Sequence, residues 1–313
     1  MYTHTTAIRR SGFKLFASLL VVAALVGACG SGGATSPAPP TAPPTSSPAD
    51  GGSAAPDTGF RLRATTVQAL APIETFGWLP SLVISGDLVA IQAGAIPAIY
   101  PGPLVTPLLA SQLTEAAWQT IVADARTAGL LSGASDFTGG GMPLGSAAGR
   151  VEMIVDGRTF DFTGDPSRVM RCITTPCVPG PGTPEAFGGF WERLGNLSGW
   201  LGSEVQASGP WDAPAYAVLA GPPPAQDPQL GSPPLAWPFA VPAASFGDPV
   251  KGDSARRCGV ARGADAGALR TALGTATQLT RWGDAASPAT LVGLTIRPLV
   301  PGDDDPCAVL TGS

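Results

Sequence analysis

Alternating apolar and polar residues predict two antiparallel hairpins. In SLVISGDLVAIQ (81–92), two β-rich runs flank Gly86-Asp87, which is typical of a two-residue turn. In RVEMIVDGRTFDF (150–162), Asp156-Gly157 supplies the two positive-φ residues of a type I′ turn. Period-two alternation places the apolar residues of the second hairpin on shared faces. They are Val151, Met153, Val155, Phe160 and Phe162.

The segment LTEAAWQTIVADARTAGLL (113–131) has the period of an amphipathic helix. Thr114 is suited to the N-cap, and Gly129 to a left-handed residue that ends the helix. Four apolar residues recur at the spacing i, i+3, i+4 and i+7, and we expect this stripe to face the core. They are Trp118, Ile121, Val122 and Ala125.

Two further segments predict helices. TPEAFGGFWERLGNLSGWL (183–201) has Thr183 as its cap, Pro184 at its first position and a wide apolar face. ADAGALRTALGTATQL (264–279) is a weaker helix, which we expect Asp265 to cap. Both helices are expected to pack on a sheet.

The order of these elements predicts an α+β fold. A strand at 289–300 follows the third helix, and a proline-rich segment, 221–242, predicts a long irregular loop leading into an edge strand. We expect antiparallel β-sheet with about three helices packed on one face. Both halves run strands, helix, strand, so a duplicated unit is one interpretation. Gly and Pro number 41 and 34, which favours a loop-rich fold with short elements.

The N-terminus has the order of a bacterial export signal. Arg9-Arg10 and Lys14 precede an apolar stretch of 14 residues, 15–28, which is shorter than the roughly 20 residues of a spanning helix. Val26-Gly27-Ala28-Cys29 resembles a lipobox, in which cleavage before the cysteine is followed by its acylation. Residues 1–28 are therefore predicted to be a lipoprotein signal peptide. Paired arginines suit twin-arginine export, but Phe13 lies one place later than that motif usually has it, so general secretion is at least as well supported.

Composition divides the remaining chain. Residues 29–58 are rich in Gly, Ser, Ala, Thr and Pro and are predicted to be a disordered tether. Residues 59–313 are predicted to form the globular region, with 59–205 and 212–313 as possible sub-domains. We expect the protein to be bound to the cell membrane through lipid on Cys29, on the extracytoplasmic side.

Charge and histidine content exclude several function classes. The chain has 18 basic and 23 acidic residues, and loss of three basic residues with the signal peptide leaves a net charge of −8. No basic patch is visible, which argues against nucleic acid as a partner. The single histidine, His4, lies in the signal peptide. The mature chain therefore lacks histidine-based catalysis and histidine metal ligands, so we expect no cofactor, no metal and a non-enzymatic role.

Four cysteines remain once Cys29 is assigned to lipidation, and they fit an exported protein. Three connectivities are open. We favour Cys172–Cys177 and Cys258–Cys307, because each pair brackets one local segment. Metal binding is the alternative for the first pair, but its sequence lacks the spacing of zinc ligands.

Two aromatic residues are the candidate binding residues, Tyr100 and Trp237. Tyr100 begins a YPGP turn. An exposed tyrosine there would suit a binding surface, but we favour a ring that packs against the neighbouring hairpin. Trp237 stands near the end of the proline-rich segment.

Acidic side chains offer two weaker candidates. Asp303–Asp305 is expected to be a solvated loop, because a run of aspartates lacks the converging ligands of a calcium site. The tetrapeptide DFTG occurs at 136–139 and at 161–164. Two aspartate loops could share a cation, although we interpret the repetition as chance.

Several motifs together resemble a set of uncharacterised lipoproteins from high-GC bacteria. The resemblance rests on a GD hairpin (86–89), AIYPGP (98–103), the helix at 113–131, RCGVARGADAGALRTAL (257–273) and LTIRPLVPGDDDPC (294–307). These motifs are turns, caps and core positions, so the resemblance carries no activity over to this chain.

Three hypotheses for function follow. The one we favour is a non-enzymatic binding or interaction module of the cell envelope, with an envelope protein or a glycan as its partner. A carboxylate-dependent hydrolase of envelope glycans is the second, since paired carboxylates need no histidine. A structural spacer domain is the third.

Overall fold

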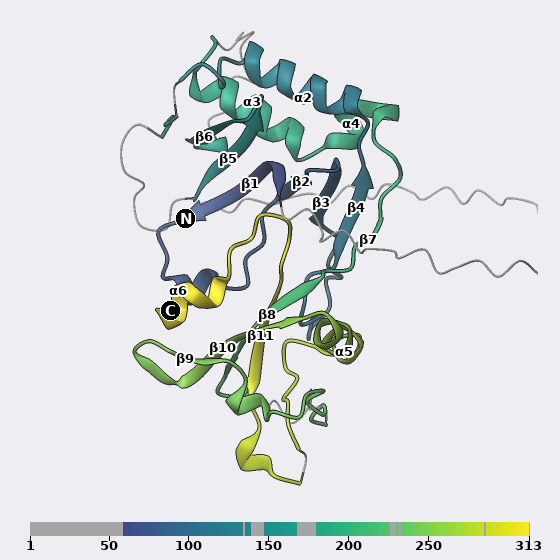
Figure 1. The fold of residues 1–313 in the computed structure, drawn as a ribbon, viewed down its shortest axis with the longest axis vertical. Coiled ribbons are helices and arrows are strands. Elements are labelled where there is room, and N and C mark those ends of the chain that lie inside the picture. Colours follow the sequence, from purple (N-terminus) through teal and green to yellow (C-terminus); the bar gives the residue numbers. More distant parts are fainter. Residues whose placement is uncertain are drawn as a thin grey trace, which may run out of the picture. The chain divides into compact units, whose positions relative to one another are not determined.

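The computed structural model describes residues 59–133, 135–138, 147–167, 180–225, 230, 233–284 and 286–312, and these belong to one compact unit. The predicted signal peptide and tether, with Cys29, lie outside the described residues, as do Cys172 and Cys177. The described part is α+β with two antiparallel sheets, as predicted (Figure 1).

The larger sheet has seven strands, and every neighbouring pair is antiparallel. The first strand, β1, bonds to β2 on one side and β5 on the other, so it lies inside the sheet. In spatial order the strands are β6 (Arg158–Gly164), β5 (Ala147–Val155), β1 (Phe60–Gln68), β2 (Leu82–Ser85), β3 (Val89–Ala93), β4 (Leu108–Gln112) and β7 (Gly209–Pro210).

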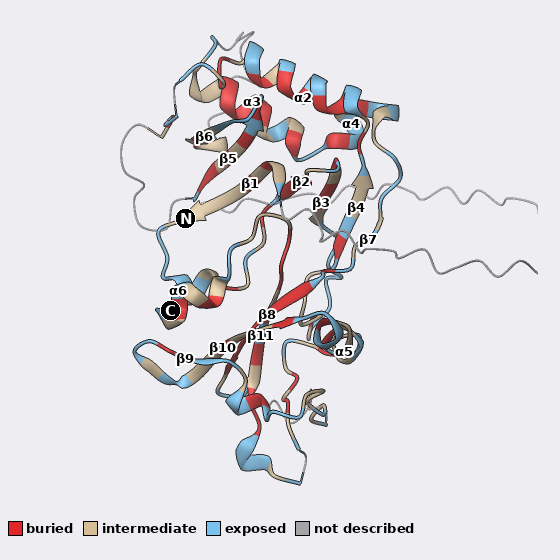
Figure 2. Cartoon of the chain, viewed as in Figure 1, coloured by how far each residue is buried: buried red, intermediate tan, exposed pale blue. Residues whose placement is uncertain are grey.

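One face of this sheet is covered by α2 (Glu115–Thr127), α3 (Pro184–Leu194) and α4 (Leu197–Leu201). Figure 2 shows the buried side of these helices turned toward the strands. The core between them is apolar and includes Leu62 of β1, Ile121 of α2 and Phe187 of α3, all fully buried. A further 3₁₀ turn, η2 (Gly202–Glu204), follows α4.

The smaller sheet has the antiparallel order β11 (Gly293–Pro298), β8 (Ala215–Gly221), β10 (Asp253–Arg262) and β9 (Asp248–Val250). The helix α5 (Ala264–Leu273) packs on it, and α6 (Pro306–Thr311) packs on its other side against β8, β9 and β10. The remaining short helices are α1 (Pro72–Thr75), η3 (Ala243–Ser245) and η4 (Pro288–Thr290).

The Cys258–Cys307 disulfide is present and joins β10 to α6, which confirms that pairing. It closes the helix–strand unit between the two cysteines. Because the two cysteines are 49 positions apart, the bond removes much of the conformational freedom of the unfolded chain.

Both predicted hairpins form. Asp156 and Gly157 have φ of 52° and 71°, as a type I′ turn requires. The first hairpin differs at its turn, where the left-handed residue is Leu88, with φ of 66°, rather than either residue of Gly86-Asp87. The Ser85 side chain explains this wider turn, since it accepts from the Val89 N–H and also bonds to the Asp87 carboxylate.

The helices agree with prediction in part. The Thr114 hydroxyl caps α2 by accepting from the Ala117 N–H at 3.1 Å, and Gly129 is left-handed with φ of 75°. The second predicted helix is two helices, because the Asn196 side chain starts a new one by accepting from the Gly199 N–H. The third begins after Gly263, so Asp265 lies inside it and is not its cap.

Three helices pack on one face of the larger sheet, as expected, although the third predicted helix, α5, packs on the smaller sheet instead. One expectation about the arrangement needs correction. Within the described part of 221–242, the expected edge strand is absent, and Leu235 makes only an isolated bridge to Trp282. The division into sub-domains, and a duplication, remain predictions.

Candidate functional site

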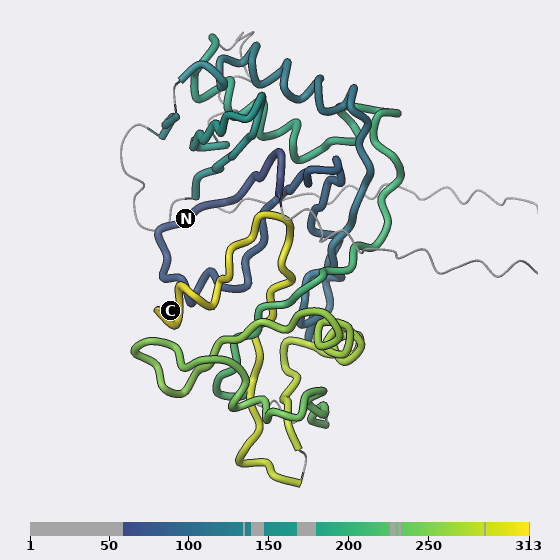
Figure 3. Tube along the Cα trace, viewed as in Figure 1, coloured from purple at the N-terminus to yellow at the C-terminus, as the bar shows by residue number. Residues whose placement is uncertain are grey.

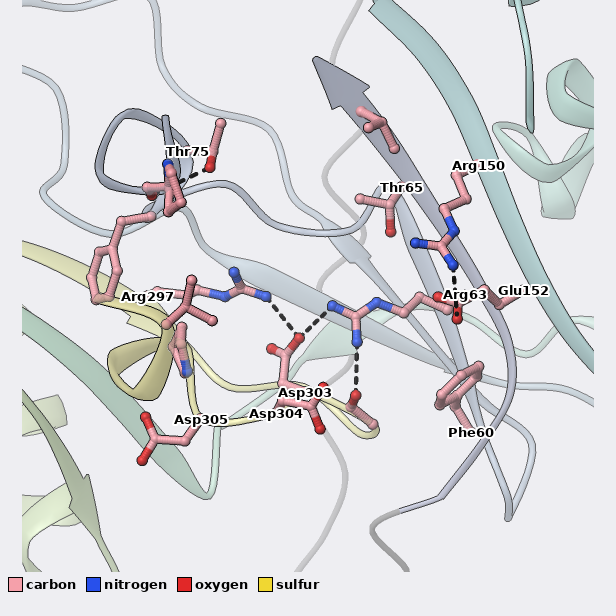
Figure 4. Close-up of a pocket in the computed structure, with 16 residues that line it drawn as sticks. Phe60, Arg63, Thr65, Thr75, Arg150, Glu152, Arg297, Asp303, Asp304 and Asp305 are labelled. Atoms are coloured by element: carbon pink, nitrogen blue, oxygen red, sulfur yellow. Dashed lines mark hydrogen bonds and ion pairs between the residues drawn. The ribbon is translucent and has the colours of Figure 1, made fainter. Parts of the chain in front are cut away.

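A cleft of about 660 Å³ lies on the face of the seven-stranded sheet that the helices leave uncovered (Figure 4). Strands β1 and β5 form one wall, and α1 with the C-terminal segment forms the other. The lining residues are Phe60, Arg63, Thr65, Val67, Pro72, Thr75, Phe76, Arg150, Glu152, Arg297, Gly302, Asp303, Asp304, Asp305, Pro306 and Val309.

Strand alternation determines which side chains reach this cleft. On β1, Leu62 and Ala64 are buried under the helices, so Arg63 and Thr65 point to the opposite face. On β5, Val151 and Met153 are buried in the same core, which turns Arg150 and Glu152 toward the cleft. The pattern that builds the apolar core therefore also builds the charged wall.

Asp303 lies at the centre of a buried ion-pair network. Its Oδ1 accepts from Arg63 Nη2 at 2.6 Å and from Arg297 Nη2 at 2.7 Å. Its Oδ2 accepts from the Val300 N–H at 3.0 Å, and its side chain is 1% exposed. The three charged groups come from β1, β11 and the loop before α6, so they hold the C-terminal segment on the sheet (Figure 4).

The loop that carries Asp303 needs glycine at position 302. Gly302 has φ of 76°, and a Cβ there would overlap the ring of Phe60. Its carbonyl accepts from Arg63 Nη1 at 2.8 Å. The tight approach of this loop to β1 is what buries Asp303, so the expectation that this aspartate is solvated was wrong.

Its two neighbours differ from it, because Asp304 and Asp305 are exposed. Asp305 caps α6 by accepting from the Cys307 N–H at 2.8 Å. Of the carboxylates in the cleft, Asp303 and Asp305 thus have structural partners. Glu152 makes a longer ion pair, 3.7 Å from Arg150, and Asp304 is exposed, so these two carboxylates are the best placed to contact a ligand.

Arg150 lies on the more open side of the cleft and belongs to a second, solvated group of charges. It makes two hydrogen bonds to the Asp161 carboxylate and lies 3.7 Å from Glu152. The hydrogen bonds that Arg150 donates to Asp161 raise the pKa of Arg150 above its usual range, against the opposing effect of partial burial. Arg150 therefore stays charged and oriented.

The cleft has nearly balanced charge. Three arginines and four carboxylates line it, and most of them pair with one another. Paired charges present both donors and acceptors while producing little net field. Two threonines and several apolar side chains, those of Phe60, Val67, Pro72, Phe76, Pro306 and Val309, also line it. Such a surface suits an uncharged, polar ligand better than a polyanion.

Tyr100 is highly exposed, at 66%, so the interpretation that it packs against the hairpin was wrong. It lies in the connection between β3 and β4, and its peptide bond to Pro101 is cis. It does not line the cleft. That Tyr100 contacts a binding partner remains a prediction.

Trp237 is partly buried in an aromatic cluster. Its ring lies 4.7 Å from Phe239, 5.4 Å from Phe246 and 6.1 Å from Trp282, measured between centroids. Its Nε1 donates to the Val241 carbonyl at 2.8 Å. These contacts give Trp237 a packing role and leave little of its ring for a ligand.

The described part of the first DFTG segment, 136–138, lies beside the second segment, 161–164, which the sequence did not lead us to expect. Asp136 and Thr163 form a parallel bridge, and the Phe137 N–H donates to the Thr163 carbonyl. The two aspartates nevertheless have separate partners, since Asp136 accepts from Thr138 and Asp161 from Arg150. Hydrogen bonds from the Thr138 hydroxyl and N–H lower the pKa of Asp136.

Among the described residues, no cluster of three or more His, Cys, Asp or Glu side chains could hold a metal ion. Among those residues, no helix is both long and apolar enough to cross a membrane.

The sequence did not identify Arg63 or Arg297 as site residues. Arg63 and Asp303 are 240 positions apart, and local patterns carry no information about such a contact. The alternation of FRLRA (60–64) could have indicated a strand with arginines on one face. Comparison with family models, with curated proteins and with solved structures found no match, so the resemblance to high-GC lipoproteins stays a prediction.

Proposed function

We propose that this chain is an exported, lipid-anchored protein of the cell envelope whose folded region is a binding module. The cleft beside β1 and β5 is its ligand site, and an envelope glycan is the class of ligand that fits. Cys29 carries the lipid, and the segment that follows it connects the anchor to the module. The lipobox resemblance and the disulfide support the export part of this proposal.

The balanced charge of the cleft is the observation that carries the glycan part. A polyol needs donors and acceptors at close spacing, and the arginine and carboxylate groups supply both. A phosphate-rich ligand would meet four carboxylates against three arginines. Because Arg63 and Arg297 are already bound to Asp303, ligand contact falls to Thr65, Glu152 and Asp304.

The test is binding of a soluble Cys29→Ser form to purified envelope glycans, followed by calorimetry or NMR titration. Thr65→Val removes a hydroxyl and Glu152→Gln replaces a carboxylate with a neutral amide, so each leaves a polar group of the bound glycan with a lost or weaker hydrogen bond. We expect each substitution to weaken binding about tenfold. The matched controls are Thr159→Val on β6 and Glu192→Gln on α3, which lie outside the cleft.

Equal affinity in the cleft variants and the controls would contradict the site. Binding of a protein and of no glycan would contradict the ligand class. The anchor is tested separately by fractionation, because Cys29→Ser should move the protein from membranes to the soluble fraction.

The hydrolase alternative rests on Glu152 and Asp304, two carboxylates from different segments that line one cleft. It requires new reducing ends when the protein is incubated with envelope glycan. Their loss in Glu152→Gln and in Asp304→Asn would favour it over binding alone. The spacer alternative requires instead that any tethered globular domain can replace residues 59–313 without a phenotype.

A further inference from the structure

Six consecutive exposed residues in the β3–β4 connection are all apolar. They are Ala95–Tyr100, and within them Ile96 is 54% exposed while Ile99 and Tyr100 are each 66% exposed. Runs of more than about three or four exposed apolar residues are unfavourable in water and usually mark a contact surface. We call residues 95–100 the apolar tip.

The apolar tip is presented from a fixed base. The Gly94 N–H donates to the Pro107 carbonyl at 2.8 Å, which closes the connection. Farther along, the Leu104 N–H donates to the Ala276 carbonyl at 3.0 Å, and the Gln278 N–H donates to the Gly102 carbonyl at 3.1 Å. Both ends of the connection are thus bound, and binding there would not have to order the whole segment.

The composition of the connection suits the interface of a bilayer. No charged residue occurs from Ala93 to Thr106. Pro97 and Pro101 lack an N–H, so fewer backbone donors lose water when the tip leaves solvent. Tyrosine is enriched at membrane interfaces, where its ring is buried and its hydroxyl stays hydrated. Tyr100 supplies such a group beside two isoleucines.

We propose that the apolar tip inserts into the surface of the same bilayer that holds the lipid on Cys29. This inference rests on the proposed lipid anchor. The chain from Cys29 to Gly59 reaches at most about 100 Å, so the bilayer is always within range of the module. A tethered surface has an effective concentration in the millimolar range, which lets a weak apolar contact become a stable one.

The charge of the chain favours this mode of contact over headgroup attraction. The mature chain has a net charge of −8, so anionic headgroups repel it. Insertion of uncharged side chains is the remaining route to the membrane, and it predicts binding that salt hardly weakens. A second protein could cover the same tip, and the experiment separates the two.

Hydrogen exchange with mass spectrometry on the lipidated protein tests the proposal directly. Phosphatidylcholine vesicles should slow exchange in peptides covering 93–107, compared with the soluble Cys29→Ser form without vesicles. In parallel, flotation measures how the Cys29→Ser form partitions onto vesicles. Replacing Ile96, Ile99 and Tyr100 with serine should reduce that partition at least about tenfold. Val241→Ser, at a residue 50% exposed, is the control that should not change it.

Unchanged exchange at 93–107 in protein that floats with vesicles would overturn the insertion and leave the anchor standing. If the protein purified from cells carries no lipid on Cys29, the proposed anchor is contradicted. Flotation of the soluble Cys29→Ser form would then still test whether the apolar tip inserts into a bilayer. Slower exchange with an envelope protein fraction, but not with vesicles, would overturn insertion in favour of a protein partner.

Discussion

The two faces of the seven-stranded sheet are built by different kinds of interaction. The helical face is a continuous apolar core, in which Ile121, Phe187 and Phe190 are fully buried. The opposite face holds a cleft whose buried centre is Asp303 between two arginines. Apolar contacts are numerous and individually modest, whereas the ion-pair network is a small set of groups that depend on one another.

This difference predicts how the stability of each face responds to a substitution. Loss of one apolar side chain leaves a cavity that its neighbours partly fill. Loss of the central carboxylate leaves two guanidinium groups buried without a counter-charge. The cleft face should therefore be more sensitive to a single polar substitution than the helical face is to a conservative apolar one.

The largest effect is expected from Asp303→Ala. Removing one member of a buried ion pair costs about 3–5 kcal/mol, and here two arginines lose their partner. Urea unfolding of the oxidised protein measures the change. The triple replacement Arg63→Met, Asp303→Leu and Arg297→Met should cost less than Asp303→Ala alone, since no buried charge remains. A triple variant as unstable as the single one would contradict this account.

A matched comparison uses Asp161, which also binds an arginine but is 44% exposed in its side chain. Water screens that pair, so Asp161→Ala should cost no more than about 1 kcal/mol. If both aspartates cost the same, burial would not be the reason for the sensitivity of the cleft face.

On the helical face, Ile121→Ala should cost about 2–5 kcal/mol, through lost burial and the cavity left behind. Ile121→Val should cost about 1 kcal/mol, because it removes a single methylene group. Both are measured by urea unfolding. The comparison of the two faces predicts that the loss of unfolding free energy at Ile121 grows with the volume removed, whereas a single substitution at Asp303 causes the largest loss.

A smaller effect is expected where α2 begins. Thr114→Ala removes the hydroxyl that accepts from the Ala117 N–H, and loss of such a cap costs about 1 kcal/mol. Thr114→Ser should retain most of that stability, because it keeps the hydroxyl. Thermal unfolding of the two variants side by side provides the measurement.

The smallest effect lies at the edge of the sheet, at Asp136. Its pKa is lowered by hydrogen bonds from Thr138, so its contribution to stability is present above the unfolded pKa and is lost as pH falls through the folded pKa. Thr138→Ala should raise the pKa of Asp136 toward its ordinary value. An NMR titration of the carboxyl carbon checks this, and an unchanged pKa would exclude the hydroxyl as the main cause.

The helical face could be predicted from the sequence because its signals are local. Thr114, Gly129 and the stripe through Ile121 occupy one short window, and Asp156-Gly157 specifies its turn without help from elsewhere. The break at Asn196 was missed because the apolar face continues across it, although its side chain is well suited to start a helix.

The cleft face could not be predicted in the same way. Arg63, Arg297 and Asp303 come from opposite ends of the folded region, and each looks like an ordinary surface residue in its own window. The run of three aspartates suggested solvation, and only the close approach of Gly302 to Phe60 buries the first of them. Tyr100 illustrates the reverse error, since its exposure depends on the path of the whole connection.

The position of Asp303 also has a consequence for how the protein is made. Arg63 belongs to β1, and its partner Asp303 lies 240 positions later in the chain. A nascent chain that ends before residue 303 therefore cannot complete this ion pair, whatever else it has formed. The buried charge of Arg63 is therefore neutralised by Asp303 only after all the strands from β1 to β11 have been synthesised.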